Sequence, residues 1–167
     1  TQQELASIKM LFTQGRLKEV LSAANLMIKH FPKSVILYNI LGATNARLKN
    51  FDSAIANYKK AIKIKPDFAE AHNNIGNVLR ANGDLQKAIE SYDIATKINS
   101  FYSEAFSNKG NTFRSMGKLE KAIECYNQAI KINPGFAEAY NNMGNVYKSA
   151  GKQDKAIKNY KQAINLK

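Results

Sequence analysis

The stretch AEAHNNIGNVLRANGDLQKAIESYDIATKINSFY, residues 69–102, decides the fold, because the rest of the chain repeats it. Shifted by 34 residues, the same pattern of apolar, small and aromatic residues returns on both sides, with a weaker version at the start. Self-similarity with a period of about 20 to 50 residues is typical of repeat proteins. We therefore expect a single array of five copies, with the boundaries 1–34, 35–68, 69–102, 103–136 and 137–167.

Each copy has the pattern of two helices joined by a tight turn. In the third copy, apolar residues recur at helical spacing over residues 69–82 and again over residues 85–98. Gly83 stands between these two segments, and glycine readily adopts the left-handed conformation that ends a helix. Proline follows the second helix in three copies, at Pro32, Pro66 and Pro134, and proline cannot continue a helix. The pattern predicts an all-α chain of paired helices.

The fourth and fifth copies carry an aromatic, glycine, aromatic, alanine, aromatic series at fixed positions. The residues are Phe106, Gly110, Phe113, Ala122 and Tyr126, then Tyr140, Gly144, Tyr147, Ala156 and Tyr160. This series and its period resemble the tetratricopeptide repeat. The resemblance covers the whole chain. It implies an α-solenoid, a right-handed superhelix of five antiparallel helix–turn–helix units, in which the first helix of each unit lines the inner wall.

Small and large residues recur at separate positions of the copies. We expect the helical glycines to face alanines of the paired helix; the residues are Gly76, Gly110 and Gly144, and Ala88, Ala122 and Ala156. Tyrosine recurs once in the second helices, at Tyr58, Tyr92, Tyr126 and Tyr160. Because these tyrosines recur at helical spacing, we interpret them as core residues and not as a cofactor-binding motif. The first copy departs from the pattern, with Ile8 for the glycine and Ala24 for the tyrosine.

The composition narrows the classes of function. The net charge is +12, which suggests acidic partners. The lysines, however, fall mainly on outward positions of the second helices, which favours a solvated face over a nucleic-acid surface.

A single cysteine, Cys125, indicates a reducing, cytoplasmic location. With only His30 and His72 beside it, we expect no metal and no cofactor. No apolar run reaches the roughly 18 residues of a membrane span. Because the first residue is Thr1, we expect a fragment of a longer protein, whose native start and any signal peptide are not seen.

A polar stripe recurs on the first helices of the last three copies, at positions 2, 6, 9 and 13 of each copy. The stripe reads acid, amide, amide and small residue, with a cation beside it at position 12. We predict that its amides and cations bind a ligand: Asn74, Asn77, Arg80, Asn108, Asn111, Arg114, Asn142, Asn145 and Lys148. The small residues, Ala81, Ser115 and Ser149, leave room beside them.

Asparagine suits the recognition of a polypeptide backbone. Its side chain has two donors and an acceptor with two lone pairs, so that one residue can hold both the N–H and the C=O of an extended peptide. A row of such residues would bind a strand-like ligand whatever its side chains. The alternative is that the asparagines reflect only the general richness of the chain in Asn, Lys and Ile. Their phasing over three copies favours binding, and we expect these positions to be exposed.

The asparagine row is similar to the tetratricopeptide domain of the O-linked N-acetylglucosamine transferases. In that family the amide at position 6 lines the lumen and holds extended polypeptide, and Asn74, Asn108 and Asn142 match it. A second precedent, the carboxylate clamp of cochaperones, needs lysine at position 5. Leu5, Asn39, Asn73, Ser107 and Asn141 stand there, which disfavours the clamp.

No pattern in the chain indicates catalysis. The inward carboxylates of Glu70, Glu104 and Glu138 come one to a copy, too isolated for an acid–base pair. We interpret His72 and Cys125 as packing residues. The sequence therefore predicts a non-catalytic protein–protein interaction scaffold that binds an extended segment in its groove, as the targeting arm of a larger enzyme such as a glycosyltransferase. Two alternatives stay open: a module that stacks end to end into oligomers, and a basic surface for nucleic acid.

Overall fold

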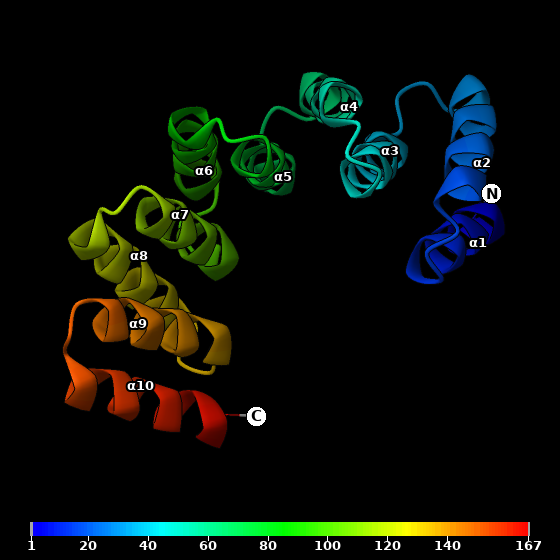
Figure 1. Ribbon diagram of the computed structural model, residues 1–167. Coiled ribbons are helices and arrows are strands. Elements are labelled where there is room, and N and C mark those ends of the chain that lie inside the picture. The colour runs from blue at the N-terminus through cyan, green and yellow to red at the C-terminus, as the bar shows by residue number, and fades with distance from the viewer. Residues whose placement is uncertain (1, 167) are drawn as a thin grey trace. The chain divides into compact units, whose positions relative to one another are not determined.

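The computed structural model describes residues 2–166, and within them all regular structure is helical. Ten helices follow one another as five successive helix–turn–helix segments (Figure 1), which confirms the predicted all-α solenoid class. They are α1 (Gln2–Thr13), α2 (Leu17–His30), α3 (Val35–Arg47), α4 (Phe51–Ile64), α5 (Ala69–Ala81), α6 (Leu85–Ile98), α7 (Ser103–Ser115), α8 (Leu119–Ile132), α9 (Ala137–Ser149) and α10 (Gln153–Asn165). Over the described residues, no helix has both the length and the apolar character needed to cross a membrane.

The turn within each pair depends on one residue with a left-handed backbone. In four copies this residue is glycine, for example Gly83 with φ +91° and Gly117 with φ +73°. The second copy has Lys49 there, with φ 62°. Its N–H bonds to the carbonyl of Ala46, as the Gly117 N–H bonds to that of Arg114. The turn is therefore kept in the second copy, but with a side chain in a conformation that disfavours one.

The helices divide into two compact units, an N-terminal unit of α1–α5 and a C-terminal unit of α6–α10. In the N-terminal unit, one core cluster joins α1, α2 and α3, and another joins α4 and α5. In the C-terminal unit, α8 and α9 share a cluster that includes Tyr126 and Val146, both fully buried. In both units a second helix packs on the first helix of the next copy. That residues 1–167 form a single array stays a prediction.

The recurrent glycines lie against tyrosine rings. A Cβ added to Gly42, Gly110 or Gly144 would lie 2.5, 2.7 or 2.6 Å from Cε1 of the tyrosine sixteen positions later. These tyrosines are Tyr58, Tyr126 and Tyr160. For Gly110 and Gly144, our prediction that glycine faces alanine was wrong, because the flat ring lies directly on the glycine backbone; for Gly76 and Ala88 it stays a prediction. The core role of the tyrosines is confirmed for Tyr58 and Tyr126, which are almost fully buried.

In the first copy, the large and the small residue of this contact are exchanged between the two helices. Ile8 occupies the glycine position and Ala24 the tyrosine position, and both are buried in one cluster. A large residue on the first helix and a small one on the second fill the space that Gly and Tyr fill in later copies. The departure noted in the sequence is thus a paired substitution.

Lys109 lies in the seam where the other later copies have an apolar residue. Its ammonium group contacts a carboxylate oxygen of Asp93 on α6 at 2.5 Å, and it also lies 5.7 Å from the ring centre of Phe113. Only 20% of the Lys109 side chain is exposed. The lysine therefore keeps its charge at the edge of the seam by pairing it with the neighbouring helix.

Candidate functional site

The predicted stripe lies on the first helices, which form one side of each unit. We call the side formed by α1, α3 and α5, and that formed by α7 and α9, the first-helix faces (Figure 1). The predicted ligands are not equally accessible. Arg114 and Lys148 are exposed, and the side chains at positions 6 and 9 are partly buried, except for Asn142. Asn142 is only 8% exposed, so the expectation that it is exposed was wrong.

Position 6 joins neighbouring copies in the N-terminal unit. Asn74 on α5 donates from Nδ2 to Oδ1 of Asn39 on α3 over 3.3 Å, and Asn39 donates from Nδ2 to Glu70 on α5 over 2.7 Å. Part of the hydrogen-bonding capacity of Asn74 is therefore used to hold α5 against α3. Sequence reasoning missed Asn39 as a partner. The available signal was that position 5 of one copy lies beside positions 2 and 6 of the next.

The equivalent pair in the C-terminal unit is Ser107 on α7 and Asn142 on α9. Ser107 is 2% exposed, and the polar atom of serine lies one bond closer to the backbone than those of the asparagine at position 5 of the second copy. Within the described part of the chain, Ser107 Oγ and Asn142 Nδ2 are both buried without a hydrogen-bond partner. The shorter side chain explains why the bond seen between Asn39 and Asn74 is not repeated here.

The asparagines at position 9 are anchored by the tyrosines of the paired helix. The hydroxyl of Tyr126 donates to Oδ1 of Asn111, and that of Tyr160 donates to Oδ1 of Asn145, both over 2.8 Å. In each pair the structure places Oδ1 of the amide, an acceptor, against the tyrosine hydroxyl. The acceptor points into the helix pair, and the NH₂ group is directed away from the tyrosine. These residues thus present an N–H donor to a ligand, whereas we predicted that each amide would present both a donor and an acceptor.

The second copy has Ala43 at position 9, and a cavity of about 230 Å³ lies there. The residues that line it include Phe12, Phe51, Val78 and Tyr58. Burial, with a smaller effect of the nearby Glu70 carboxylate, raises the pKa of Tyr58 far above its ordinary value. Sequence reasoning missed this cavity. The signal was the single alanine at a position where the three later copies have asparagine.

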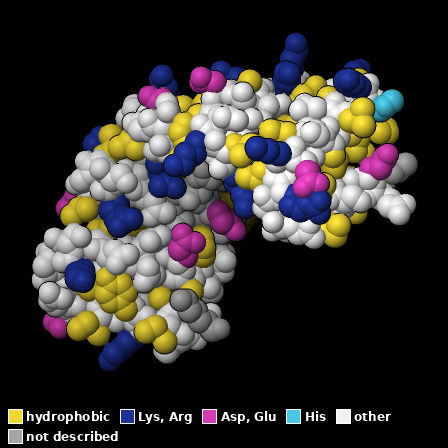
Figure 2. Space-filling view, turned by 45° about the vertical axis from the view of Figure 1, so that its right-hand side comes forward, with side chains coloured by type: hydrophobic (Ala, Val, Ile, Leu, Met, Phe, Trp, Pro, Cys, Tyr) yellow, Lys and Arg dark blue, Asp and Glu magenta, His cyan; other side chains and the backbone are white. Residues whose placement is uncertain are grey.

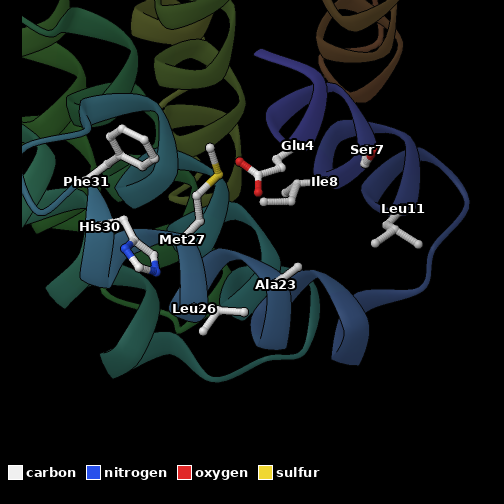
Figure 3. Close-up of a pocket in the computed structure, with 9 residues that line it drawn as sticks. All are labelled: Glu4, Ser7, Ile8, Leu11, Ala23, Leu26, Met27, His30 and Phe31. Carbon is white, nitrogen blue, oxygen red and sulfur yellow. The ribbon is translucent and has the colours of Figure 1, made fainter. Parts of the chain in front are cut away.

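A larger cavity of about 530 Å³ lies between α1 and α2 (Figure 3). The apolar lining comes from Ile8 and Leu11 on α1, Ala23 and Met27 on α2, and Phe31 directly after α2. In Figure 3 the side chain of Met27 points toward Glu4 across the space between the helices. Sequence reasoning did not find this cavity either, although the apolar character of the first copy is visible in the sequence.

The remaining polar groups show no cluster of catalytic or metal-binding type. Among the residues that the structure describes, no three His, Cys, Asp or Glu side chains gather as metal ligands would. Burial raises the pKa of the Cys125 thiol to about 11 and lowers the pKa of the partly buried His72. Lysine and arginine side chains lie singly or in small groups across the face shown in Figure 2, with acidic groups among them.

Solved structures with the same fold cover almost the whole chain. One crystal structure of MamA is 30% identical, covers 95% of this chain and 93% of its own, and gives a TM-score of 0.80. A TPR protein from Thermus thermophilus (20% identity, TM-score 0.82) covers 99% of this chain and 90% of its own. YrrB, described as a TPR protein with an unusual peptide-binding site (19%, 0.70), covers 98% and 84%. At these lower identities the last two show the fold alone.

Sequence comparisons identify the repeat itself. A probable UDP-N-acetylglucosamine–peptide N-acetylglucosaminyltransferase of Arabidopsis thaliana, SEC, is 30% identical over 83 residues. The match spans half of this chain and only 8% of the length of that relative. Profiles described as TPR repeat match residues 42–83 and 110–151, and profiles described as tetratricopeptide repeat match residues 69–102 and 137–167. The chain belongs to the tetratricopeptide repeat family, a family of protein–protein interaction scaffolds.

Proposed function

We propose that this chain binds an extended polypeptide segment along its first-helix faces, without a catalytic step of its own. The observation that carries the proposal is the tyrosine-anchored amide at position 9. Asn111 and Asn145 each have their acceptor held by a tyrosine and their NH₂ group directed away from it. Two such donors on successive copies suit the carbonyl groups of an extended backbone, which recur along a strand. Exposed Arg114 and Lys148 beside them add cations.

The test uses substitutions that change the donors without removing the tyrosine bond. In Asn111→Asp/Asn145→Asp, a carboxylate oxygen still accepts from each tyrosine, but the NH₂ donors are lost. The matched control is Asn127→Asp/Gln128→Glu, which adds the same charge on exposed positions of α8. Both variants and the wild type are applied to an array of unstructured peptides after their helicity has been compared.

We expect the wild type and the control to capture the same peptides, and the Asn111→Asp/Asn145→Asp variant to lose them. Capture of no peptide by the wild type would reject the proposal. So would equal capture by all three proteins, because the amides would then contribute nothing.

The similarity to the plant transferase supports a finer version of the proposal. As part of a longer protein, this array would select polypeptides for a glycosyltransferase. Its single cysteine supports a cytoplasmic setting. The finer version predicts that a peptide captured by the first-helix faces inhibits modification of protein substrates by the full-length protein. Unchanged modification at saturating peptide would contradict it.

A second candidate function is association between copies of the chain, and α10 provides the observation that favours it. Ile157 and Ile164 are 50% and 70% exposed on α10. Their counterparts on α8, Ile123 and Ile130, pack in the cluster shared with α9. The equivalence of α10 and α8 thus indicates that the first helix of a repeat in another molecule would cover this face of α10. Analytical ultracentrifugation of the wild type and of Ile157→Glu/Ile164→Glu tests this, since only the wild type should form oligomers at micromolar concentration.

A further inference from the structure

We propose that the cavity beside Ala43 is a side-chain pocket on the first-helix face of the N-terminal unit, and that it takes a neutral side chain with an apolar body and a hydrogen-bond acceptor at its tip. Tyrosine and glutamine meet this description, whereas leucine and phenylalanine lack the acceptor. The inference rests on the proposed binding of an extended polypeptide, and it adds a specificity element that a grip on the backbone lacks.

The pocket arises from one change in a repeated contact. The ring of Tyr58 lies on Gly42 through the same atoms, Cε1, Cδ1 and Cζ, by which Tyr126 lies on Gly110. The two hydroxyl groups therefore reach the same place relative to their first helices, beside the residue after the glycine. In the fourth copy that residue is Asn111, which accepts the bond. In the second copy it is Ala43, whose methyl group neither fills the space nor accepts a hydrogen bond.

The hydroxyl of Tyr58 consequently faces the cavity and not an asparagine. Tyr58 is 2% exposed, and its hydroxyl does not make the bond to position 9 that Tyr126 and Tyr160 make. The raised pKa keeps this hydroxyl protonated at neutral pH. It is therefore a donor that any occupant of the cavity must satisfy, because a buried donor without a partner weakens binding.

The walls define the body of the occupant. Phe12, Phe51 and Val78 line the cavity, which measures about 230 Å³. An apolar cavity of about 150 Å³ holds benzene, so the space accommodates one large side chain. Arg47 at the rim is already engaged: its Nη1 donates to the carbonyl of Phe12 over 2.9 Å, and its guanidinium lies 4.9 Å from the Phe12 ring centre. It forms part of the wall.

Charges of both signs lie beside the cavity, because Arg47 forms part of its wall and Glu70 lies near Tyr58. Glu70 is close enough to raise the pKa of Tyr58 by its charge, and it would repel a second carboxylate. A neutral acceptor avoids this repulsion and still satisfies the hydroxyl. Asn74 and Asn77 also line the cavity, so that its walls are neutral and polar on this side.

The test begins from a peptide captured by the wild type in the array experiment. Each position of that peptide is replaced in turn by Tyr, Gln, Phe, Leu and Glu, and dissociation constants are measured by fluorescence anisotropy. We expect one position at which Tyr or Gln binds about tenfold or more tightly than Phe, Leu or Glu, which matches the penalty for one unpaired buried donor. Tyr58→Phe should abolish this preference, because it removes the donor and keeps the ring.

Ala43→Asn is the second arm of the test. It installs the asparagine of the later copies, fills the cavity and gives Tyr58 the acceptor that Tyr126 has. We expect binding of the Tyr or Gln peptide to weaken at least about tenfold, while the thermal midpoint stays equal or rises, so that loss of binding is not loss of fold. Unchanged binding by Ala43→Asn, or a preference that survives Tyr58→Phe, would overturn the pocket.

The two proposals fail in different ways. If the wild type captures peptides that depend on Asn111 and Asn145, yet no peptide position shows the preference, the pocket is rejected and the backbone grip stands. If the wild type captures no peptide at all, the proposed function and the pocket are rejected together.

Discussion

The hydroxyl of Tyr126 donates a 2.8 Å hydrogen bond to Asn111, whereas Tyr58, seated on its glycine in the same pose, faces Ala43. We expect Tyr126→Phe to lower the free energy of unfolding by about 1 kcal/mol, the usual net contribution of one such bond. Tyr58→Phe should change it by less than about 0.5 kcal/mol, because no bond is lost. Urea unfolding followed by circular dichroism compares the two, and equal losses would contradict the assignment.

The contact between Gly110 and Tyr126 makes the helix intolerant of even one methyl group. Alanine favours a helix over glycine by about 1 kcal/mol, yet its Cβ at position 110 would lie 2.7 Å from the ring. We expect Gly110→Ala to be destabilising by about 1–3 kcal/mol, as overpacked core substitutions are. Thermal unfolding measures this. A rise in the midpoint would show that the ring shifts freely.

The first copy suggests how that contact can be rebuilt. Gly110→Ile/Tyr126→Ala copies the pairing of Ile8 with Ala24. We expect the double variant to be more stable than the sum of the two single changes by about 1 kcal/mol or more, because residues in contact couple. Strict additivity in the double-mutant cycle would contradict the view that the two positions exchange size.

Lys49 holds a left-handed backbone that glycine holds in the other copies. Removing the side chain relieves this strain, which for a residue other than glycine is about 1–2 kcal/mol. Glycine in turn gives the unfolded chain more freedom, which offsets part of the gain. We expect Lys49→Gly to be stabilising by about 0.5–1 kcal/mol. Lys152→Gly, at an exposed position after the equivalent turn of the fifth copy, serves as a control for loss of a lysine and should not be stabilising.

The ion pair of Lys109 with Asp93 is partly buried. Removing the carboxylate alone should therefore change the free energy of unfolding differently from replacing the lysine with an apolar residue. Asp93→Ala leaves the Lys109 ammonium beside an apolar seam, and we expect a loss of about 1–2 kcal/mol in unfolding free energy. Lys109→Met puts an apolar side chain where the fifth copy has Met143, which is 7% exposed. This change should be neutral or stabilising. A loss as large as that of Asp93→Ala would show that the charge pair itself stabilises the seam.

His72 should make stability depend on pH. Burial lowers its pKa below the ordinary 6.5, so the unfolded chain binds a proton more readily than the folded one. Stability is therefore complete above about pH 6.5 and falls as pH decreases from there to the lowered folded pKa. His72→Tyr, which copies Tyr38 and Tyr140, should abolish this part of the pH dependence. Denaturant midpoints at pH 5 and pH 8 test it, with the wild type expected to lose more on acidification.

The sequence predicts the helices well because each boundary depends on local chemistry. The segment 85–98, marked by helical periodicity and a preceding glycine, coincides with α6. The partners across helices were harder to predict, because a period shows which positions recur and not which of them meet. Glycine was assigned to alanine, although the ring of a tyrosine lies against it.

The candidate site shows the same limit. Asparagine at positions 6 and 9 looks alike in sequence, but Asn74 bonds to another copy and Asn111 to its own paired helix. Neither role depends on the residue type alone. Differences between copies contain this information: Ala43 stands where Asn111 is expected, and Ile8 and Ala24 exchange sizes together. Reading the copies against one another as aligned relatives would have found both contacts.

The exchange of residue sizes at Ile8 and Ala24 also disfavours misassembly of the repeats. Near-identical repeats can pair out of register during folding, and misassembly of this kind is a known failure of repeat proteins. If α1 docked where α3 belongs, Ile8 would strike the ring of Tyr58. If α3 took the place of α1 against α2, Gly42 would face Ala24 across an empty space. The sizes of the two residues in this contact thus distinguish the first copy from the later ones and disfavour alignments that exchange it with one of them.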